Sequence, residues 1–283
     1  MDNNLYNNIY KATLTDLEFK QLSQFIQSNY GIKMPPIKKV VLQGRLHKRL
    51  KHLAIPDFKT YIEYVFSREG ENEIIHMMDV VSTNKTDFYR EPVHFEFLET
   101  ELLPHLFKLH GRGTFKVWSA GCSSGEEPYT LAIVLQEFKE KNLGFDYQIL
   151  ATDISTQMLQ TGANAVYKEE KISIIPLSIK KKYFLRSKDH NDPRIRVVKT
   201  LRDKVSFQRL NFMDNTYQVN DQFDIIFCRN ALIYFERENQ EMVINKLCQK
   251  LKPEGFFLLG HSESITNMNV PLKSIKPTIF KKT

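Results

Sequence analysis

Val117-Trp-Ser-Ala-Gly-Cys-Ser-Ser-Gly-Glu-Glu-Pro-Tyr129 is the stretch that decides the fold of this chain. An apolar strand leads into a loop of small residues, and the loop leads into a helix whose first turn carries Pro128. Gly121 and Gly125 allow a ligand to approach the backbone closely. Because ligands of open α/β sheets bind where such loops leave the strands, this stretch predicts a ligand site.

Two acidic residues, Glu126 and Glu127, open the helix that follows this loop. Carboxylates there would repel a pyrophosphate, which disfavours NAD and ATP. They suit a cationic ligand, such as the sulfonium and ammonium groups of S-adenosylmethionine. The alternative is that both acids only stabilise the helix N-terminus through its dipole, and the loop by itself leaves both interpretations open.

After about Leu109, short apolar runs alternate with helical stretches, which predicts a parallel sheet covered on both faces. Residues 165–200 interrupt this alternation with two strand-like pieces, 182–185 and 194–198, on either side of a turn at 187–193. They predict a small antiparallel insertion. The runs predicted as strands of the main sheet are 115–119, 147–152, 205–210, 223–228 and 255–260.

The first 80 or so residues predict helices and no strands. Thr15 and Glu18 form a capping box, after which apolar residues repeat at helical spacing as far as Gly31. Further helices are predicted at 36–53, 58–66 and 71–81. The predicted organisation is a helical domain over 1–80, a linker over 81–92 and an α/β domain over 93–283.

Polar side chains end two of the predicted strands. Asp153 is placed to accept both hydroxyls of a ribose, or it caps the next helix. Arg229 and Asn230 end the strand 223–228, and a charge at such a position needs a partner. Tyr234 follows closely, although a tyrosine between Ile and Phe is more often a core residue. The spacing of polar residues in the linker favours a simple capped connection.

Composition restricts the class of protein. The chain has 283 residues, 42% of them hydrophobic, and a net charge of +7. Seven Lys or Arg and a single acid, Asp57, fall between Lys38 and Lys59, so the basic character is concentrated there. Three separated cysteines and no signal or membrane-spanning run predict a cytoplasmic protein without membrane insertion. The sequence contains no CxxC motif and no histidine cluster, so it does not predict a metal site.

Six motifs, taken in order, make the sequence resemble the CheR-type chemotaxis receptor methyltransferases over nearly its whole length. They are N-x-T-x-F-Y-R-E at 84–91, S-x-G-C-S-S-G-E-E-P-Y at 119–129, A-T-D-I-S at 151–155, F-D-x-I-F-C-R-N-x-L-I-Y-F at 223–235, L-K-P-x-G at 251–255 and G-H-S-E at 260–263. The resemblance implies a class I S-adenosylmethionine-dependent methyltransferase, with a Rossmann-like doubly wound sheet and a small antiparallel β insertion. An all-helical N-terminal domain would precede it.

The same resemblance implies a role for individual residues. S-adenosyl-L-methionine would be the cofactor and S-adenosyl-L-homocysteine the product. Tyr234 and Arg229 would lie beside the transferred methyl group as catalytic candidates. The residues implied to bind the cofactor are Asn84, Thr86, Arg90, Glu126, Asp153, Asn211, Phe212, Arg229 and Asn230.

The implied reaction forms γ-methyl esters on glutamate side chains of methyl-accepting chemotaxis receptors. Arg45, Lys48 and Arg49 of the basic helix would bind the receptor's cytoplasmic helices, and the β insertion docks a C-terminal tether peptide in some family members. Two alternatives keep the cofactor site: a methyltransferase for nucleic acid or a small molecule, and a non-catalytic S-adenosylmethionine module. The basic cluster lacks interleaved aromatic residues, which disfavours nucleic acid. Nothing in the sequence requires more than a monomer.

Overall fold

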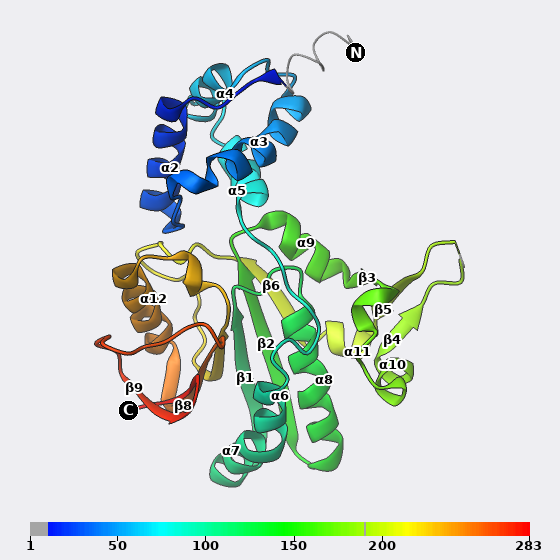
Figure 1. The fold of residues 1–283 in the computed structure, drawn as a ribbon. Coiled ribbons are helices and arrows are strands. Elements are labelled where there is room, and N and C mark those ends of the chain that lie inside the picture. The colour runs from blue at the N-terminus through cyan, green and yellow to red at the C-terminus, as the bar shows by residue number, and fades with distance from the viewer. Residues whose placement is uncertain (1–10, 190) are drawn as a thin grey trace.

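The computed structural model describes residues 11–189 and 191–283. The first ten residues of the predicted helical domain and His190 of the predicted turn therefore lie outside the described residues. Figure 1 shows a helical part stacked on the end of an α/β part, with the linker running down between them. No helix within the described ranges is long and apolar enough to cross a membrane.

The helical part is built as its sequence pattern predicts. The capping box is confirmed, since the backbone N–H of Thr15 donates to Glu18 Oε2 at 2.7 Å and the N–H of Glu18 to Thr15 Oγ1 at 3.3 Å. Apolar faces meet in one core that includes Leu22, Leu46 and Met78. The elements are α2 (Asp16–Tyr30), η1 (Pro36–Lys38), α3 (Lys39–Leu53), α4 (Phe58–Val65) and α5 (Glu73–Val81).

A seven-stranded sheet forms the centre of the α/β part, in the order β6-β2-β1-β7-β8-β10-β9. The first five strands of that order pair in parallel, as predicted. The prediction of a parallel sheet was incomplete, because β10 and β9 extend the sheet at one edge in antiparallel register. The strands are β1 (Gly113–Ala120), β2 (Phe145–Asp153), β6 (Val205–Arg209), β7 (Phe223–Cys228), β8 (Leu251–Leu259), β9 (Leu272–Lys276) and β10 (Ile279–Lys282).

Helices cover both faces of this sheet, which gives the doubly wound arrangement. Successive side chains of β1 alternate between two cores: Val117 packs with the helices of one face and Trp118 with α12 on the other. Both positions are fully buried, which explains why the central strands are apolar throughout. The covering helices are α6 (Val93–Phe97) with η2 (Leu98–Leu102) and α7 (Leu103–His110), α8 (Glu126–Lys141), α9 (Thr156–Asn164) and α12 (Arg237–Gln249).

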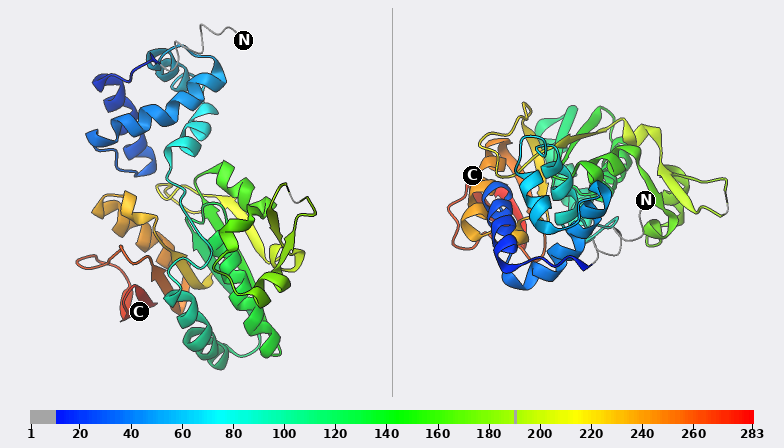
Figure 2. Two further views of the ribbon diagram at one scale, coloured as in Figure 1. Left: turned by 45° about the vertical axis from the view of Figure 1, so that its right-hand side comes forward. Right: turned by 90° about the horizontal axis from the view of Figure 1, so that it is seen from above.

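The predicted insertion is a separate three-stranded antiparallel sheet in the order β3-β5-β4. Its β3 was not among the predicted strands. The strand predicted at 182–185 starts two residues later in the structure, at Phe184, because α10 continues through Tyr183. Figure 2 shows this sheet projecting from the side of the main domain. Its elements are β3 (Val166–Lys168), η3 (Glu169–Ile172), α10 (Leu177–Tyr183), β4 (Phe184–Arg186), β5 (Arg194–Val197) and α11 (Lys199–Arg202).

Two sets of contacts hold the helical part over the carboxyl ends of the strands. Ile32 forms a β-bridge with Phe235, and the N–H of Lys33 donates to the carbonyl of Tyr234 at 2.8 Å. On α5, the carboxylate of Asp79 accepts a hydrogen bond from Ser155 Oγ at 2.7 Å. The helical part is thereby fixed next to the edge of the sheet where ligands of α/β proteins bind.

Candidate active site

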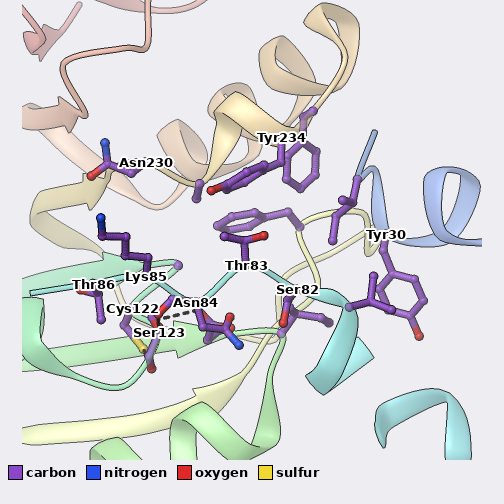
Figure 3. Close-up of a pocket in the computed structure, with 18 of the residues that line it drawn as sticks. Tyr30, Ser82, Thr83, Asn84, Lys85, Thr86, Cys122, Ser123, Asn230 and Tyr234 are labelled. Atoms are coloured by element: carbon purple, nitrogen blue, oxygen red, sulfur yellow. Dashed lines mark hydrogen bonds between the residues drawn. The ribbon is translucent and has the colours of Figure 1, made fainter. Parts of the chain in front are cut away.

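A pocket lies between the two parts of the molecule, at the carboxyl ends of β1, β2 and β7. Figure 3 shows the linker crossing it, with Ser82 to Thr86 below the turn that carries Asn230 and Tyr234. Side chains of the helical part close one wall, among them Lys38 and Arg45 of η1 and α3. The site is thus assembled from segments far apart in the sequence.

Asp153 ends β2 and lines the pocket. The N–H of Ser123 donates to its Oδ2 at 2.8 Å and the N–H of Ser155 to its Oδ1 at 2.9 Å, so both loops hold the carboxylate in place. Burial raises the pKa of Asp153, and these hydrogen bonds oppose the rise. The predicted ribose-binding carboxylate therefore lies in the pocket in a fixed orientation.

The two acids that open α8, Glu126 and Glu127, differ in their position relative to the pocket. Glu126 does not line the pocket; Ser124 Oγ donates to its carboxylate at 2.6 Å, and Lys171 of the insertion lies 3.5 Å from it. Glu127 is the one that lines the pocket. Its Oε1 accepts a hydrogen bond from Ser119 Oγ at 2.8 Å, and burial raises its pKa. We therefore expect Glu127 to contact the cofactor, and the contact predicted for Glu126 stays a prediction.

Arg229 is buried at the end of β7 between two carboxylates. Its Nη2 lies 3.1 Å from Glu91 Oε2 and its Nη1 lies 3.4 Å from Glu127 Oε2, while its guanidinium stacks over Phe95, with 5.2 Å from Cζ to the ring centroid. Two of its donors, Nε and Nη1, make no hydrogen bond to any described residue. The guanidinium of Arg229, which the sequence predicted to need a partner, thus pairs with two carboxylates. Two of its N–H-bearing atoms remain without a hydrogen bond.

The linker enters the site, contrary to its interpretation from spacing alone. Asn84, Thr86 and Arg90 all line the pocket. Ser123 Oγ of the loop after β1 donates to the carbonyl of Asn84 at 2.9 Å, the hydrogen bond drawn in Figure 3. Arg90 Nη1 donates to the carbonyl of Lys85 at 3.0 Å, which folds the linker onto itself.

The remaining predicted cofactor residues also line the pocket, from its opposite side. Asn211 Nδ2 donates to the carbonyl of Asn29 at 2.8 Å, so this side chain also ties the sheet to α2. Phe212 lies with its ring centroid 6.1 Å from that of Phe235 and gives this side an apolar surface. Tyr234 is half-buried at the wall made by the helical part, with Lys38 Nζ 5.7 Å from its ring centroid.

Two of the three basic residues predicted to bind a partner are instead engaged within the molecule. Arg45 donates to the linker carbonyls of Val81 and Ser82, the latter at 2.9 Å. Arg49 pairs with buried Glu73 through two hydrogen bonds of 2.7 and 2.6 Å. Lys48 is exposed on α3. Arg45 and Arg49 therefore make contacts within the molecule, Lys48 is exposed, and the binding of a partner by these three residues stays a prediction.

Sequence reasoning missed Glu263, a buried carboxylate in the G-H-S-E motif. Its Oε2 accepts from the N–H groups of Gly260 at 2.7 Å and Asn230 at 2.9 Å. Its Oε1 accepts from the N–H of Leu232 at 2.8 Å and that of Ile233 at 3.3 Å. The three bonds from Asn230, Leu232 and Ile233 fix the turn that carries Asn230 and Tyr234 into the pocket. A signal existed in the sequence: an acid soon after a predicted buried strand.

We expect Glu263→Gln to weaken S-adenosylhomocysteine binding roughly tenfold, because an amide NH2 would then face backbone donors. Isothermal titration calorimetry measures the change. The matched control is Asp224→Asn in β7, since Asp224 is another carboxylate that accepts a backbone hydrogen bond, from the N–H of Lys116 at 2.8 Å. Both variants should lose stability, but only the first should lose affinity. Equal losses of affinity in the two variants would contradict the positioning role.

Glu91, His94 and His261 bring three potential metal-ligating atoms within 4.8 Å of one another. The same Glu91 oxygen is bonded by Arg229 at 3.1 Å and by the N–H of His261 at 3.3 Å. Burial and the nearby Arg229 lower the pKa of His94 to about 4. Because the guanidinium already supplies the positive charge at this carboxylate, we assign no metal to the cluster.

The residues present fit S-adenosylmethionine. Glu127 offers a carboxylate to a cationic group, and Asp153 offers one to ribose hydroxyls. At Gly121, whose φ is +86°, a Cβ would come within 2.9 Å of Ala231 Cβ, so only glycine fits at this point of the pocket lining. Fold and site together define a class I methyltransferase that uses S-adenosylmethionine.

Comparison with known proteins narrows this class to one family. Residues 84–280 match the model described as "CheR methyltransferase, SAM binding domain", and residues 17–82 match "CheR methyltransferase, all-alpha domain". The chain therefore belongs to the CheR methyltransferase family, as its motifs predicted. It is a methyltransferase of chemotaxis with S-adenosylmethionine as its cofactor.

Individual relatives cover nearly the full chain. A chemotaxis protein methyltransferase of Borreliella burgdorferi is 37% identical over 273 residues, which is 95% of this chain and 95% of that protein. That of Salmonella typhimurium is 31% identical over 258 residues, covering 91% of this chain and 87% of the relative. That of Escherichia coli is 31% identical over 261 residues, covering 91% and 88%.

Proposed function

We propose that this methyltransferase esterifies glutamate side chains on the cytoplasmic helices of methyl-accepting chemotaxis receptors. The observation that carries the proposal is the wall contributed by the helical part, where Lys38 and Arg45 line the same pocket as Tyr234. Two cations on the side from which a second substrate would enter attract an anionic group such as a carboxylate. They would repel a cationic amine.

A carboxylate acceptor simplifies what the protein must do. The ordinary pKa of a glutamate is about 4.3, so the acceptor is ionised near neutral pH and needs no general base. Bound S-adenosylmethionine supplies an activated methyl group. Tyr234 and the pocket walls then orient the acceptor oxygen and exclude water from the site. Arg229 holds Glu127 and Glu91 in place, and a direct contact with the acceptor stays a prediction.

Incubation with methyl-labelled S-adenosylmethionine and receptor cytoplasmic fragments tests the proposal. We expect base-labile label on the receptor that is released as methanol, the signature of an ester. Label on RNA would favour a nucleic acid substrate, and no transfer to any acceptor would favour a non-catalytic module. Receptor fragments with and without their C-terminal segment show whether a tether peptide adds to the insertion, in which β3 and β4 are the edge strands.

Tyr234→Phe should lower the turnover number more than it lowers cofactor affinity. The hydroxyl is removed from the wall that the acceptor passes, whereas the ring that packs in the pocket is kept. Single-turnover methylation of the receptor fragment and calorimetric titration of S-adenosylhomocysteine separate the two quantities. Wild-type values of both would remove Tyr234 from the reaction.

A further inference from the structure

A carboxylate of the helical part caps a helix of the α/β part. Asp79 of α5 lies at the N-terminus of α9, where its Oδ1 accepts a hydrogen bond from Ser155 Oγ at 2.7 Å and its Oδ2 one from Thr156 Oγ1 at 2.9 Å. The backbone N–H of Gln157 donates to the same Oδ1 at 3.3 Å. The side chain of Asp79 is only 8% exposed, so this cap is buried between the two parts.

The N-terminus of α9 carries no acid of its own. None of the residues in its first turn is acidic, although a helix N-terminus favours negative charge. The N-cap residue, Ser155, accepts with its Oγ from the N–H of Met158 at 3.2 Å and donates its hydroxyl proton to Asp79. Asp79 therefore supplies, from the helical part, both the charge and the acceptor that complete this helix end.

The capped residue also holds the carboxylate that we expect to bind the ribose. The backbone N–H of Ser155 donates to Asp153 Oδ1 at 2.9 Å, and Ser155 is fully buried. Asp153 lines the pocket, whereas Asp79 is not among the lining residues. Two hydrogen bonds through Ser155 thus connect a residue outside the pocket to the one that faces the ligand.

We propose that Asp79 is a positioning residue for Asp153 and that, through it, the docked helical part raises the affinity of the α/β part for S-adenosylmethionine. Asp79 keeps Ser155 in place, and Ser155 keeps the carboxylate of Asp153 turned toward the ribose. By thermodynamic linkage, the bound cofactor in turn stabilises the contact between α5 and α9. This inference rests on the cofactor and is independent of the identity of the methyl acceptor.

Asp79→Ala should weaken the binding of S-adenosylhomocysteine and of 5′-methylthioadenosine alike, roughly tenfold each, because both ligands carry the ribose. Isothermal titration calorimetry measures both affinities. Asp79→Asn keeps the size of the side chain and an acceptor for Ser155 Oγ, so it should lose about threefold, and it carries the test if the alanine variant does not fold. Wild-type affinity in these variants would overturn the inference.

Asp57→Ala is the matched control. Asp57 caps α4 within the helical part, where its Oδ1 accepts from the N–H of Thr60 at 2.8 Å. Its loss should lower the melting temperature, as the loss of a helix cap does, and leave both affinities unchanged. A loss of affinity equal to that of the Asp79 variants would mean that Asp79 acts only through general stability, and the inference would fail.

A double-mutant cycle tests the route through Asp153. In an Asp153→Asn background, the carboxylate that Asp79 positions is gone, so the added Asp79→Ala or Asp79→Asn change should cause little further loss of affinity. If the two losses multiply instead, Asp79 acts independently of Asp153, which contradicts the proposal.

Discussion

Asp153→Asn should weaken the binding of S-adenosylhomocysteine by about 100-fold, or close to 3 kcal/mol. The carboxylate is held by N–H groups of Ser123 and Ser155 and presents its remaining acceptor capacity to the pocket. An amide removes the charge that strengthens hydrogen bonds from a ribose, and it turns an NH2 group toward one of the two backbone donors. Isothermal titration calorimetry at fixed ionic strength measures the loss.

The same strand provides the control for this experiment. Asp146, near the start of β2, is bonded by Lys139 at 2.9 Å and Lys204 at 2.7 Å, and these partners lower its pKa to about 2. Asp146→Asn should cost some stability and leave the affinity for S-adenosylhomocysteine unchanged. If the two variants bind alike, Asp153 has no direct part in holding the ribose.

Glu127→Gln should weaken S-adenosylhomocysteine binding about 30-fold, because a charge-assisted contact is worth roughly 2 kcal/mol. Glu127 lines the pocket and lies beside Arg229, 3.4 Å from Oε2 to Nη1, and we expect it to contact the cationic amino acid portion. A ligand without that portion, 5′-methylthioadenosine, should bind the variant as it binds the wild type. Asp153→Asn should weaken both ligands, since both carry the ribose.

Glu126→Gln is the matched control, since the two acids are neighbours in the sequence. Glu126 faces Ser124 and Lys171, outside the pocket lining, so its variant should bind S-adenosylhomocysteine within about threefold of the wild type. A large loss in Glu126→Gln together with normal binding in Glu127→Gln would reverse the assignment made from the structure.

Most of the fold could be predicted from local patterns. The Thr15–Glu18 capping box, the apolar runs of the central strands and the interrupted stretch that became the insertion all carry short-range signals. The two antiparallel strands at the sheet edge were missed. Leu272–Lys276 is mostly exposed, and Ile279–Lys282 has only two apolar residues before two lysines, so neither shows the longer apolar run that marks a central buried strand.

The site could be predicted only in part, and the errors share a physical cause. Consecutive residues of a helix point about 100° apart, so Glu126 and Glu127 could not be distinguished until α8 was seen packed on its strand. The directions of Arg45 and Arg49 depend on linker carbonyls and on Glu73, which lie more than twenty residues away. Spacing within α3 contains no information about them.

The sequence by itself determined most of the helices and the five parallel strands, that Asp153 and Arg229 follow the ends of two of those strands, and that the motifs belong to one family of methyltransferases. These properties depend on local periodicity and on the order of short motifs. The tertiary structure decided which acid lines the pocket, that the linker lines it too, and that Glu263 fixes the turn carrying Tyr234. Each of these depends on contacts between segments distant in the chain, whose geometry only the packed fold determines.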